Sequence, residues 1–280
     1  MKKILYLSLL LFVFTAKAQE SIVYKMKYLP DHSYSGIVTM VMKCNVNLSG
    51  DEQVLSKLKE QGMTPPIAFN MNMKMTGATK TGAAGADKSF PFNMTYTFDE
   101  LSMNVNGNNI PMPANAKTSA NIFGHVAADG KLKADSVTGS KMKDTSEKKI
   151  TQMMNAFQTK IKFPDQPMHV GDTFTQDMPL NLPMGGSNVP ANSKAVYKLV
   201  SIANGNAYFD VVQSMDLSVP VKGNTLHING TGSGKLVFDI KNSFPTDYKT
   251  IINLKVDGNI NTLKIDATAT LDMDYKNDIQ

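Results

Sequence analysis

Apolar and polar residues alternate along most of this chain, and the clearest run spans residues 90 to 98. In that run Phe90, Phe92, Met94, Tyr96 and Phe98 hold every second position, and asparagine and threonine fill most of the places between them. A period of two is the period of a β-strand, whose successive side chains point to opposite faces of a sheet. The pattern returns up to the C terminus, so we predict antiparallel sheet with one apolar and one polar face.

The alternating segments predict a long meander of strands. Its clearest turns are Asp99-Glu100, residues 106–108 and Asp129-Gly130, the last because glycine accepts the positive φ that tight hairpins need. We therefore expect an all-β dominated fold: a curved antiparallel meander, as an open or half barrel, with two short amphipathic helices. The predicted strands are Ile22–Tyr28, Gly36–Leu48, Ile67–Thr76, Phe90–Phe98, Leu101–Val105, Asn121–Ala127, Lys131–Val137, Ala195–Ile202, Ala207–Val221, Thr225–Ile240, Asp247–Val256 and Asn261–Tyr275.

Two segments with helical periodicity interrupt the strands. Ser49 and Glu52 form a capping box before an apolar stretch, and Gly62 is placed to end that helix. A second helix is expected to begin at residues 144–146, where aspartate, threonine and serine offer cap oxygens. Its apolar stripe must lie against the curved sheet. That stripe consists of Ile150, Met153, Met154, Phe157 and Ile161.

The N-terminal segment has the pattern of a secretory signal. Lysines at positions 2 and 3 precede an apolar run over residues 4–14, and alanines at 16 and 18 provide a cleavage site. The run has about a dozen residues, whereas a helix that spans a membrane needs about 20. We therefore predict a signal peptide over residues 1–18, cleavage near Ala18/Gln19, and a periplasmic or secreted protein without a membrane span. Glutamine rather than cysteine follows the cleavage site, which indicates no lipid anchor.

Charge and cysteine content limit the partners. Residues 1–18 carry three lysines and no acidic residue, so the formal charge falls from +5 to +2 when they are removed. All 29 basic residues are lysine, and without arginine, the usual ligand of phosphates and guanine edges, we expect no nucleic-acid partner. The single cysteine, Cys44, alternates with apolar residues and is predicted to be a buried, unreactive thiol.

The mature chain is long enough to bury a large core without disulfides. Residues 19–280 are expected to form one β-rich domain, or two halves over 19–182 and 194–280. The candidate boundary is the stretch 183–193, whose proline, glycine and serine content is typical of a linker.

No segment carries a specific catalytic, metal or nucleotide motif. Gly230–Lys235 has the glycines of a phosphate loop, but Asn229 and Leu236 stand where that loop needs glycine and a hydroxyl residue. Alternate glycines favour a bend or close packing over a ligand contact. The four histidines lack zinc spacing, and Asp272 and Asp274 are typical of a solvated strand face. We expect no cofactor, no metal and no enzymatic activity; a hydrolase built from distant serine, histidine and aspartate is a third possibility.

Methionine is the unusual component of the apolar face. Its unbranched thioether side chain fills irregular gaps and adapts to varied apolar partners. These side chains either fill an ordinary core or line a deformable cavity between the sheet and the second helix. The candidate ligand-binding residues are Met71, Met73, Met75, Met94, Met153, Met154 and Phe157.

The segment Lys162–Phe174 resembles a family of uncharacterised secreted β-rich proteins of Bacteroidota-type bacteria, which share the pattern F-P-x-x-P-x-x-V-G-D-x-[WF]. The glycine-rich strand Gly230–Asp239 is also similar to theirs, and Phe174 stands where tryptophan is common. This resemblance implies export but no activity, because no catalytic residues carry over. The strand order with an inserted amphipathic helix is also similar to periplasmic lipoprotein carriers with an open half-barrel, as a fold analogy alone.

These observations favour an exported, non-enzymatic protein that binds an apolar or amphipathic ligand of lipid or lipopeptide kind. The alternative is a structural or protein-interaction module of the cell envelope. The expected partner is accordingly a hydrophobic small molecule or an envelope protein. A continuous apolar cavity would favour ligand binding, whereas a filled core with a flat exposed apolar patch would favour a partner protein.

Overall fold

One large antiparallel sheet dominates the protein. A computed structural model describes residues 21–60, 62–111, 119–139, 162–184, 187–221 and 224–280. In it, twelve strands form a single sheet in the order β7-β6-β4-β3-β2-β14-β13-β12-β11-β10-β9, and β5 pairs with β4. The strands are β2 (Ser33–Gly50), β3 (Ile67–Thr81), β4 (Phe90–Val105), β5 (Asn108–Ile110), β6 (Ser119–Val126), β7 (Leu132–Gly139), β9 (Thr173–Met184), β10 (Ser187–Ala203), β11 (Asn206–Val221), β12 (Asn224–Asp239), β13 (Phe244–Ile260) and β14 (Leu263–Ile279).

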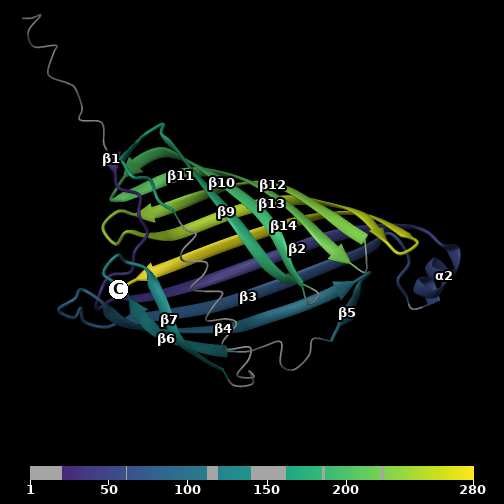
Figure 1. Ribbon diagram of the computed structural model, residues 1–280, viewed down its shortest axis with the longest axis horizontal. Helices are drawn as coiled ribbons and strands as arrows, with labels where there is room; N and C mark the ends of the chain where they lie inside the picture. Colours follow the sequence, from purple (N-terminus) through teal and green to yellow (C-terminus); the bar gives the residue numbers. More distant parts are fainter. Residues whose placement is uncertain (1–20, 61, 112–118, 140–161, 185–186, 222–223) are drawn as a thin grey trace, which may run out of the picture.

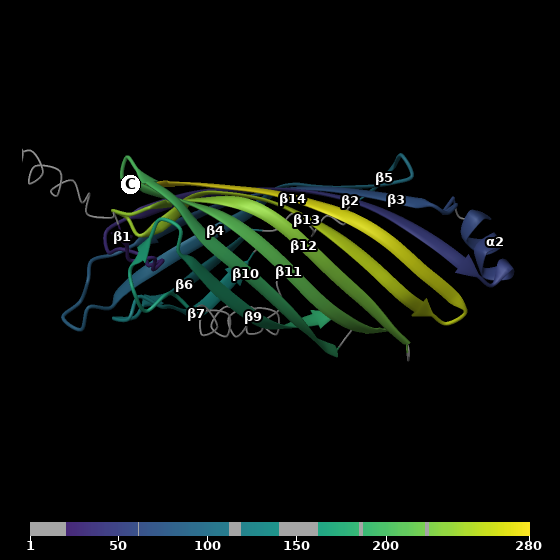
Figure 2. The ribbon, with the colours of Figure 1, turned by 90° about the horizontal axis from the view of Figure 1, so that it is seen from above.

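The sheet is open and strongly curved (Figures 1 and 2). Its order is linear, with β7 and β9 at the two edges, and β14, the last strand of the chain, pairs with β2 in the middle. A second, two-stranded sheet joins β1 (Ser21–Ile22) to β8 (Met168–His169). The all-β class and the open, curved antiparallel sheet predicted from the alternation are therefore confirmed.

A bulge, not a turn, lies at Asp99. We predicted two strands separated by a turn at Asp99-Glu100, but β4 is continuous through both residues. Lys74 pairs with Glu100 and the next residue of β3, Met75, pairs with Phe98, so Asp99 is an extra residue in β4. A bulge shifts the alternation by one position, and in the sequence this shift looks the same as the end of a strand.

The first helix is capped by a different residue from the one predicted. α2 (Glu52–Glu60) follows Asp51, whose Oδ1 accepts hydrogen bonds from the backbone N–H groups of Gln53 (2.9 Å) and Val54 (3.2 Å). Ser49, the predicted cap, lies in β2 because that strand continues to Gly50. The helix lies beyond the ends of β2 and β3, at one tip of the sheet and not on its concave face (Figures 1 and 2).

The predicted end of this helix at Gly62 is confirmed. Gly62 has φ +79° and its N–H donates to the Lys59 carbonyl, while the N–H of Met63 donates to the Leu58 carbonyl. This pair of bonds is a Schellman motif, in which glycine takes the left-handed conformation at no steric cost. The second predicted helix, with the stripe from Ile150 to Ile161, lies outside the described residues.

The stretch predicted as a linker belongs to the sheet. Residues 183 and 184 are the end of β9, and residues 187–193 are the start of β10. Pro183 is on an edge strand, and Pro190 pairs with β9 only, because the pairing of β10 with β11 begins at Ala191. A strand that pairs on one side only tolerates proline, so the composition of a linker is compatible with a hairpin here.

The best-buried core lies at one end of the concave face. The segment after β1 was predicted as a strand over Ile22–Tyr28, but only Ser21 and Ile22 form a ladder. Its Tyr24 side chain packs into a cluster that includes Phe209, Leu236 and Phe238. A second cluster of buried residues, including Phe92 and Ile122, lies where β4, β6 and β7 meet.

The Gly171-Asp172 turn of the segment Lys162–Phe174 has a structural role. Gly171 has φ +101° and its N–H donates to the Leu199 carbonyl, while Asp172 accepts the N–H of Leu199. The Asp172 carboxylate also accepts the backbone N–H of His169 at 2.8 Å. The turn therefore fixes the start of β9 against β10, which gives glycine and aspartate a structural role at these positions.

Candidate ligand-binding face

The concave face of the sheet carries contiguous rows of methionine. Residues that pair in register lie side by side, about 4.8 Å apart from strand to strand. Met71 of β3 pairs with Met42 of β2 and with Met103 of β4. Two residues further along β3, Met73 pairs with Met40. On β14, Met273 pairs with Met40. We call Met40, Met42, Met71, Met73, Met103 and Met273 the methionine rows.

The side chains of the methionine rows are half-buried, in contrast to the core at the other end of the same face. The alternate residues on these strands, such as Asn70, Asn72 and Asp272, are exposed on the convex face. The predicted division into an apolar and a polar face is thus confirmed for β2, β3 and β14. A curved surface of partly exposed thioether side chains can adapt its shape to an apolar ligand.

The structure brings together three of the predicted site residues. Met71, Met73 and Met75 follow one another on the concave side of β3. Met94 is on the same face but pairs with Thr79, four residues further along β3 than Met75, or roughly 14 Å. It packs against the buried cluster of β4, β6 and β7 and belongs to the border of the core. Met153, Met154 and Phe157 lie outside the described residues, so their place on this face stays a prediction.

Cys44 lies on the concave face beside the methionine rows. It pairs with Ala269 and with Phe69, and it is half-buried and unpaired. Burial raises the pKa of its thiol, as expected for a site with few polar groups. Cys44 thus lies on the apolar side of its strand, as predicted, but its thiol is half-buried and not fully buried as the sequence suggested.

Two glutamines also point into the concave face, and sequence reasoning missed both. Gln176 on β9 and Gln213 on β11 pair with the same residue, Ala195 of β10. The Gln213 amide donates a hydrogen bond to the Tyr248 hydroxyl. Gln176 follows Phe174 by two residues and therefore shares its side of β9. In the sequence, however, a polar residue at such a position suggests that the apolar alternation, and with it the strand, has ended.

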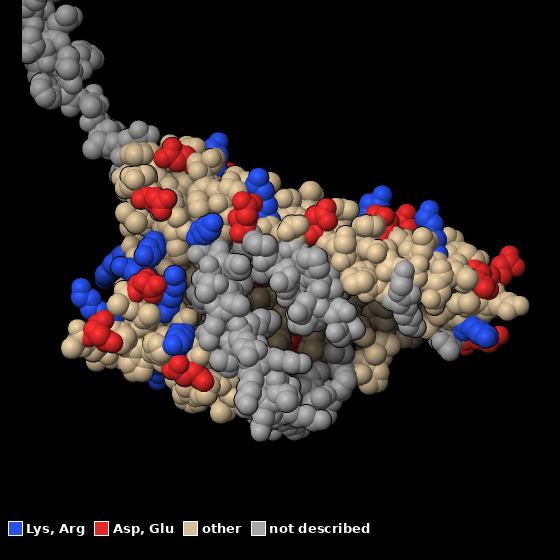
Figure 3. All heavy atoms as spheres, in the orientation of Figure 1, with Lys and Arg blue, Asp and Glu red and all other residues tan. Residues whose placement is uncertain are grey.

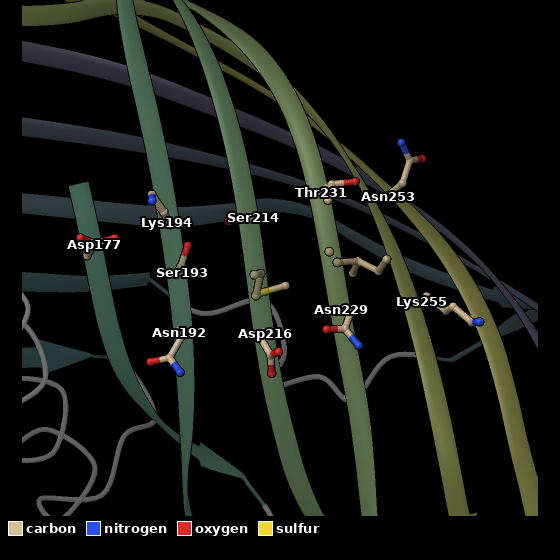
Figure 4. A pocket seen from close by; sticks show the side chains of 13 residues that line it. Asp177, Asn192, Ser193, Lys194, Ser214, Asp216, Asn229, Thr231, Asn253 and Lys255 are labelled. Atoms are coloured by element: carbon tan, nitrogen blue, oxygen red, sulfur yellow. The ribbon is translucent and has the colours of Figure 1, made fainter. Parts of the chain in front are cut away.

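A broad hollow lies along the β9–β13 part of the sheet. It has a volume of about 920 Å³ and crosses strands β9 to β13 (Figure 4). Its lining comprises three neighbouring rows of residues that pair across the strands. The middle row, which includes Met215 and Leu254, belongs to the concave face, and the rows on either side of it consist of polar residues. The polar lining residues are Asp177, Asn192, Ser193, Lys194, Ser214, Asp216, Asn229, Thr231, Asn253 and Lys255. Although most of its lining residues are polar, the surface that they expose to this hollow is mostly apolar, and none of the predicted methionine-site residues lines it.

The glycines of β12 serve packing. A Cβ atom on Gly230, Gly232 or Gly234 would approach side chains of β13 to 2.6–2.9 Å. Leu254, Ile252 and Thr250 of β13 lean over these glycines in the same order. The predicted packing role is thus supported by the close approach of the two strands.

Among the described residues, the titratable groups form ion pairs and hydrogen bonds. No cluster of three histidine, cysteine, aspartate or glutamate side chains within these ranges could hold a metal ion. His125 lies 3.0 Å from Asp135 and His169 lies 3.4 Å from Asp172. The ring nitrogens of the other two histidines contact the Pro30 carbonyl and the Ser218 hydroxyl. Figure 3 shows lysines gathered at the left end of the molecule with acidic residues among them, and further charges of both signs along the upper edge and at the right-hand tip. In the helices of the described ranges, no stretch is long and apolar enough to cross a membrane.

Comparisons with known proteins give no family. No family model matches the chain, and no curated protein matches it. Among solved structures, the β domain of the Bordetella autotransporter BrkA is 7% identical over 86% of this chain and 98% of that chain, with a TM-score of 0.21. A mutant of TodX, a monoaromatic hydrocarbon channel, is 6% identical over 91% of this chain and 92% of that chain, with a TM-score of 0.24. Likenesses of this size do not assign a function.

Proposed function

We propose that this protein is a non-enzymatic binding protein for an apolar or amphipathic ligand of lipid or lipopeptide kind, held on the methionine rows. One observation carries the proposal: six half-buried methionines from β2, β3, β4 and β14 lie contiguously on a concave face. Each methylene of a ligand buried there contributes about 0.8 kcal/mol. A chain of about 15 methylenes gives roughly 12 kcal/mol before the cost of association, which is enough for micromolar binding.

We further propose that the protein acts outside the cytoplasm. The support is the signal pattern of residues 1–18 and the resemblance of the segment Lys162–Phe174 to secreted proteins. The intact mass of protein recovered from the periplasm or medium should correspond to a chain that begins near Gln19. A full-length species in the membrane fraction would contradict this location.

The binding proposal is tested with an uncharged fluorescent probe, N-phenyl-1-naphthylamine, and by native mass spectrometry of freshly purified protein with lipid extraction. Met71→Gln with Met73→Gln keeps the side-chain length but places two amides on the concave face. Asn70→Gln with Asn72→Gln is the matched control, because these neighbours point to the convex face. We expect at least tenfold weaker probe binding for the methionine variant and wild-type binding for the control.

Wild-type protein that carries no extractable lipid and binds no probe at tens of micromolar would end the ligand proposal. The same rows would then be an apolar patch for an envelope protein, the alternative role. Equal losses in both double variants would show that the probe binds elsewhere.

A further inference from the structure

A smaller pocket lies at the packed end of the molecule, away from the methionine rows. Its volume is about 370 Å³, which is within the range of small-molecule sites. Its lining includes residues of both buried clusters, because Phe163 packs against the cluster of β10 to β12, while Tyr28 and Leu132 belong to that of β4, β6 and β7. Three segments that are distant in the sequence form it: residues 25–28, 129–132 and 163–165.

The apolar walls of this pocket are held in place by packing. The ring of Tyr28 lies 4.9 Å from that of Tyr34 and 5.0 Å from that of Phe244. The ring of Phe163 lies 6.0 Å from that of Tyr24, and the Leu132 residue is buried. A site whose walls are fixed before binding loses little conformational entropy when a ligand enters.

One carboxylate at the rim of the pocket already has a partner. Asp129 accepts the backbone N–H of Lys131 at 3.1 Å, and its other oxygen lies 3.2 Å from the Lys131 ammonium. The backbone hydrogen bond from Lys131, with smaller contributions from the Lys131 and Lys25 ammonium groups, holds the pKa of this carboxyl below its ordinary value. Asp129 and Lys131 therefore balance each other at neutral pH.

Lys25 and Lys27 leave the rim with an excess of positive charge. The lining carries three lysines and two aspartates, a net charge of +1. Both side chains are exposed, and within the described ranges neither ammonium lies at ion-pair distance from a carboxylate. Asp165, on another of the three segments, supplies the second negative charge. The segment after β1 lies at the left end of Figure 1, where Figure 3 shows the gathered lysines.

We propose that this pocket is a second binding site, for a small organic anion with an apolar, ring-sized body, such as an aryl carboxylate or an aryl sulfonate. The apolar body lies against Phe163, Tyr28 and Leu132, and the acidic group lies at the rim beside Lys25 and Lys27. Apolar walls with a few convergent polar groups are the usual form of a small-molecule site. None of the methionine rows lines this pocket, so the proposal does not depend on the proposed function.

The test uses three probes with the same naphthalene body and different charge: naphthalene-2-sulfonate, 2-naphthalenemethanol and 2-naphthylmethylammonium. Their binding is followed by the anisotropy of naphthalene fluorescence, which is free of tryptophan background because the chain has no tryptophan. We expect wild-type protein to bind the sulfonate at least fivefold more tightly than either other probe. Higher salt should reduce this preference, because the charges at the rim are exposed to solvent.

Exposed lysines at the two ends of the molecule give a matched pair of variants. Lys25→Gln with Lys27→Gln should reduce the preference for the sulfonate to less than twofold. Lys57→Gln with Lys59→Gln removes the same charge at the same spacing from α2, at the opposite tip of the sheet, and should keep the preference. Phe163→Leu should weaken all three probes at least threefold and leave their order unchanged, because it removes the aromatic wall.

Each remaining outcome would overturn the second site. Equal affinity of wild-type protein for the three probes, or equal losses in the two lysine variants, would mean that no particular lysines select an anion. Weaker sulfonate binding in Met71→Gln with Met73→Gln would place the anion on the methionine rows. Failure of all three probes would show that the pocket is empty of function, while the proposed function keeps its own test with N-phenyl-1-naphthylamine.

Discussion

The ring of Tyr24 lies 4.8 Å from that of Phe209, and this contact fixes the N-terminal segment to the concave side of β11. Phe238 of β12 adds a second ring at 5.1 Å. The segment thereby fills one end of the curved sheet with aromatic side chains. The methionine rows lie on the same face beyond this filled end, where their side chains are only half-buried. The fold thus combines a packed end, which supplies stability, with a less buried apolar surface on the same face.

Alkaline pH should weaken the packed end. Burial, with smaller contributions from Tyr197 and Tyr248, raises the pKa of Tyr24 well above its ordinary value, whereas an unfolded chain loses this proton near pH 10. Above about pH 10 the unfolded state therefore binds fewer protons than the folded state, and stability falls as pH rises.

Each such tyrosine lowers the free energy of unfolding by about 1.4 kcal/mol per pH unit in this range. Urea unfolding at pH 8 to 11.5 should show constant stability below pH 9 and a steep fall above pH 10. In Tyr24→Phe, the free energy of unfolding should fall less steeply above pH 10, by about 1.4 kcal/mol per pH unit. Parallel pH profiles for the two proteins would show that Tyr24 ionises in the folded state.

The glycines of β12 allow a second test. A Cβ on Gly234 would lie 2.3 Å from the backbone oxygen of Lys249 and 2.9 Å from the Cβ of Thr250. Gly234→Ala should therefore destabilise the protein by roughly 1–3 kcal/mol through overpacking. At Gly77 the nearest atom is the Thr95 oxygen at 3.8 Å, an ordinary contact. Gly77→Ala should be neutral or stabilising by up to about 1 kcal/mol; similar urea midpoints for both variants would contradict the packing role.

Adjacent residues on β14 test the division into two faces. Ile265 is half-buried on the concave face opposite Leu48, whereas Asp266 is exposed on the convex face. Ile265→Asp should lower the free energy of unfolding by about 2 kcal/mol, because it places a poorly solvated charge on an apolar surface. Asp266→Lys should change it by less than about 0.5 kcal/mol. Equal effects in urea unfolding would mean that the two residues do not differ in environment.

Local periodicity predicted the faces of the strands much better than their partners. In the predicted strand Asn261–Tyr275, the alternation assigned the residues of β14 from Leu263 to Tyr275 to their sides, because successive side chains of a strand point to opposite faces and one face is buried. The last residues of β14, up to Ile279, were not predicted. The alternation also indicated that Ile22 and Tyr24 share a side, and both are buried. The backbone nevertheless stops pairing with another strand after Ile22. Periodicity was misleading here because it reflects which side chains are buried and does not show whether the backbone is hydrogen-bonded in a sheet.

Long-range pairing had no sequence signal. The contact of β2 with β14 joins strands from opposite ends of the chain, and no turn residue can specify such a contact. For the candidate site, the alternation located Met71 and Met73 but not their neighbours across strands. Gln176 was missed because a single inward polar residue contradicts the apolar pattern by which β9 would have been recognised.

The single cysteine reports directly on the methionine end of the face. The thiolate is the reactive form, and burial raises the pKa of Cys44, so the thiolate fraction at pH 7 to 8 is below that of an ordinary thiol with a pKa of about 8.5. Its reaction with N-ethylmaleimide should be slow at pH 7. The rate should rise about tenfold per pH unit and level off above the ordinary thiol value.

The matched control is Cys44→Ser with Asn45→Cys, which moves the thiol by one residue to the exposed, convex side of β2. This thiol should react at least several-fold faster at pH 7, and its rate should level off at a lower pH, because it keeps its hydration. Monopalmitoylglycerol should protect Cys44 and leave the thiol at position 45 unprotected. Equal rates and equal lack of protection would mean that the ligand does not reach the concave side of β2, and the binding face would have to lie elsewhere on the sheet.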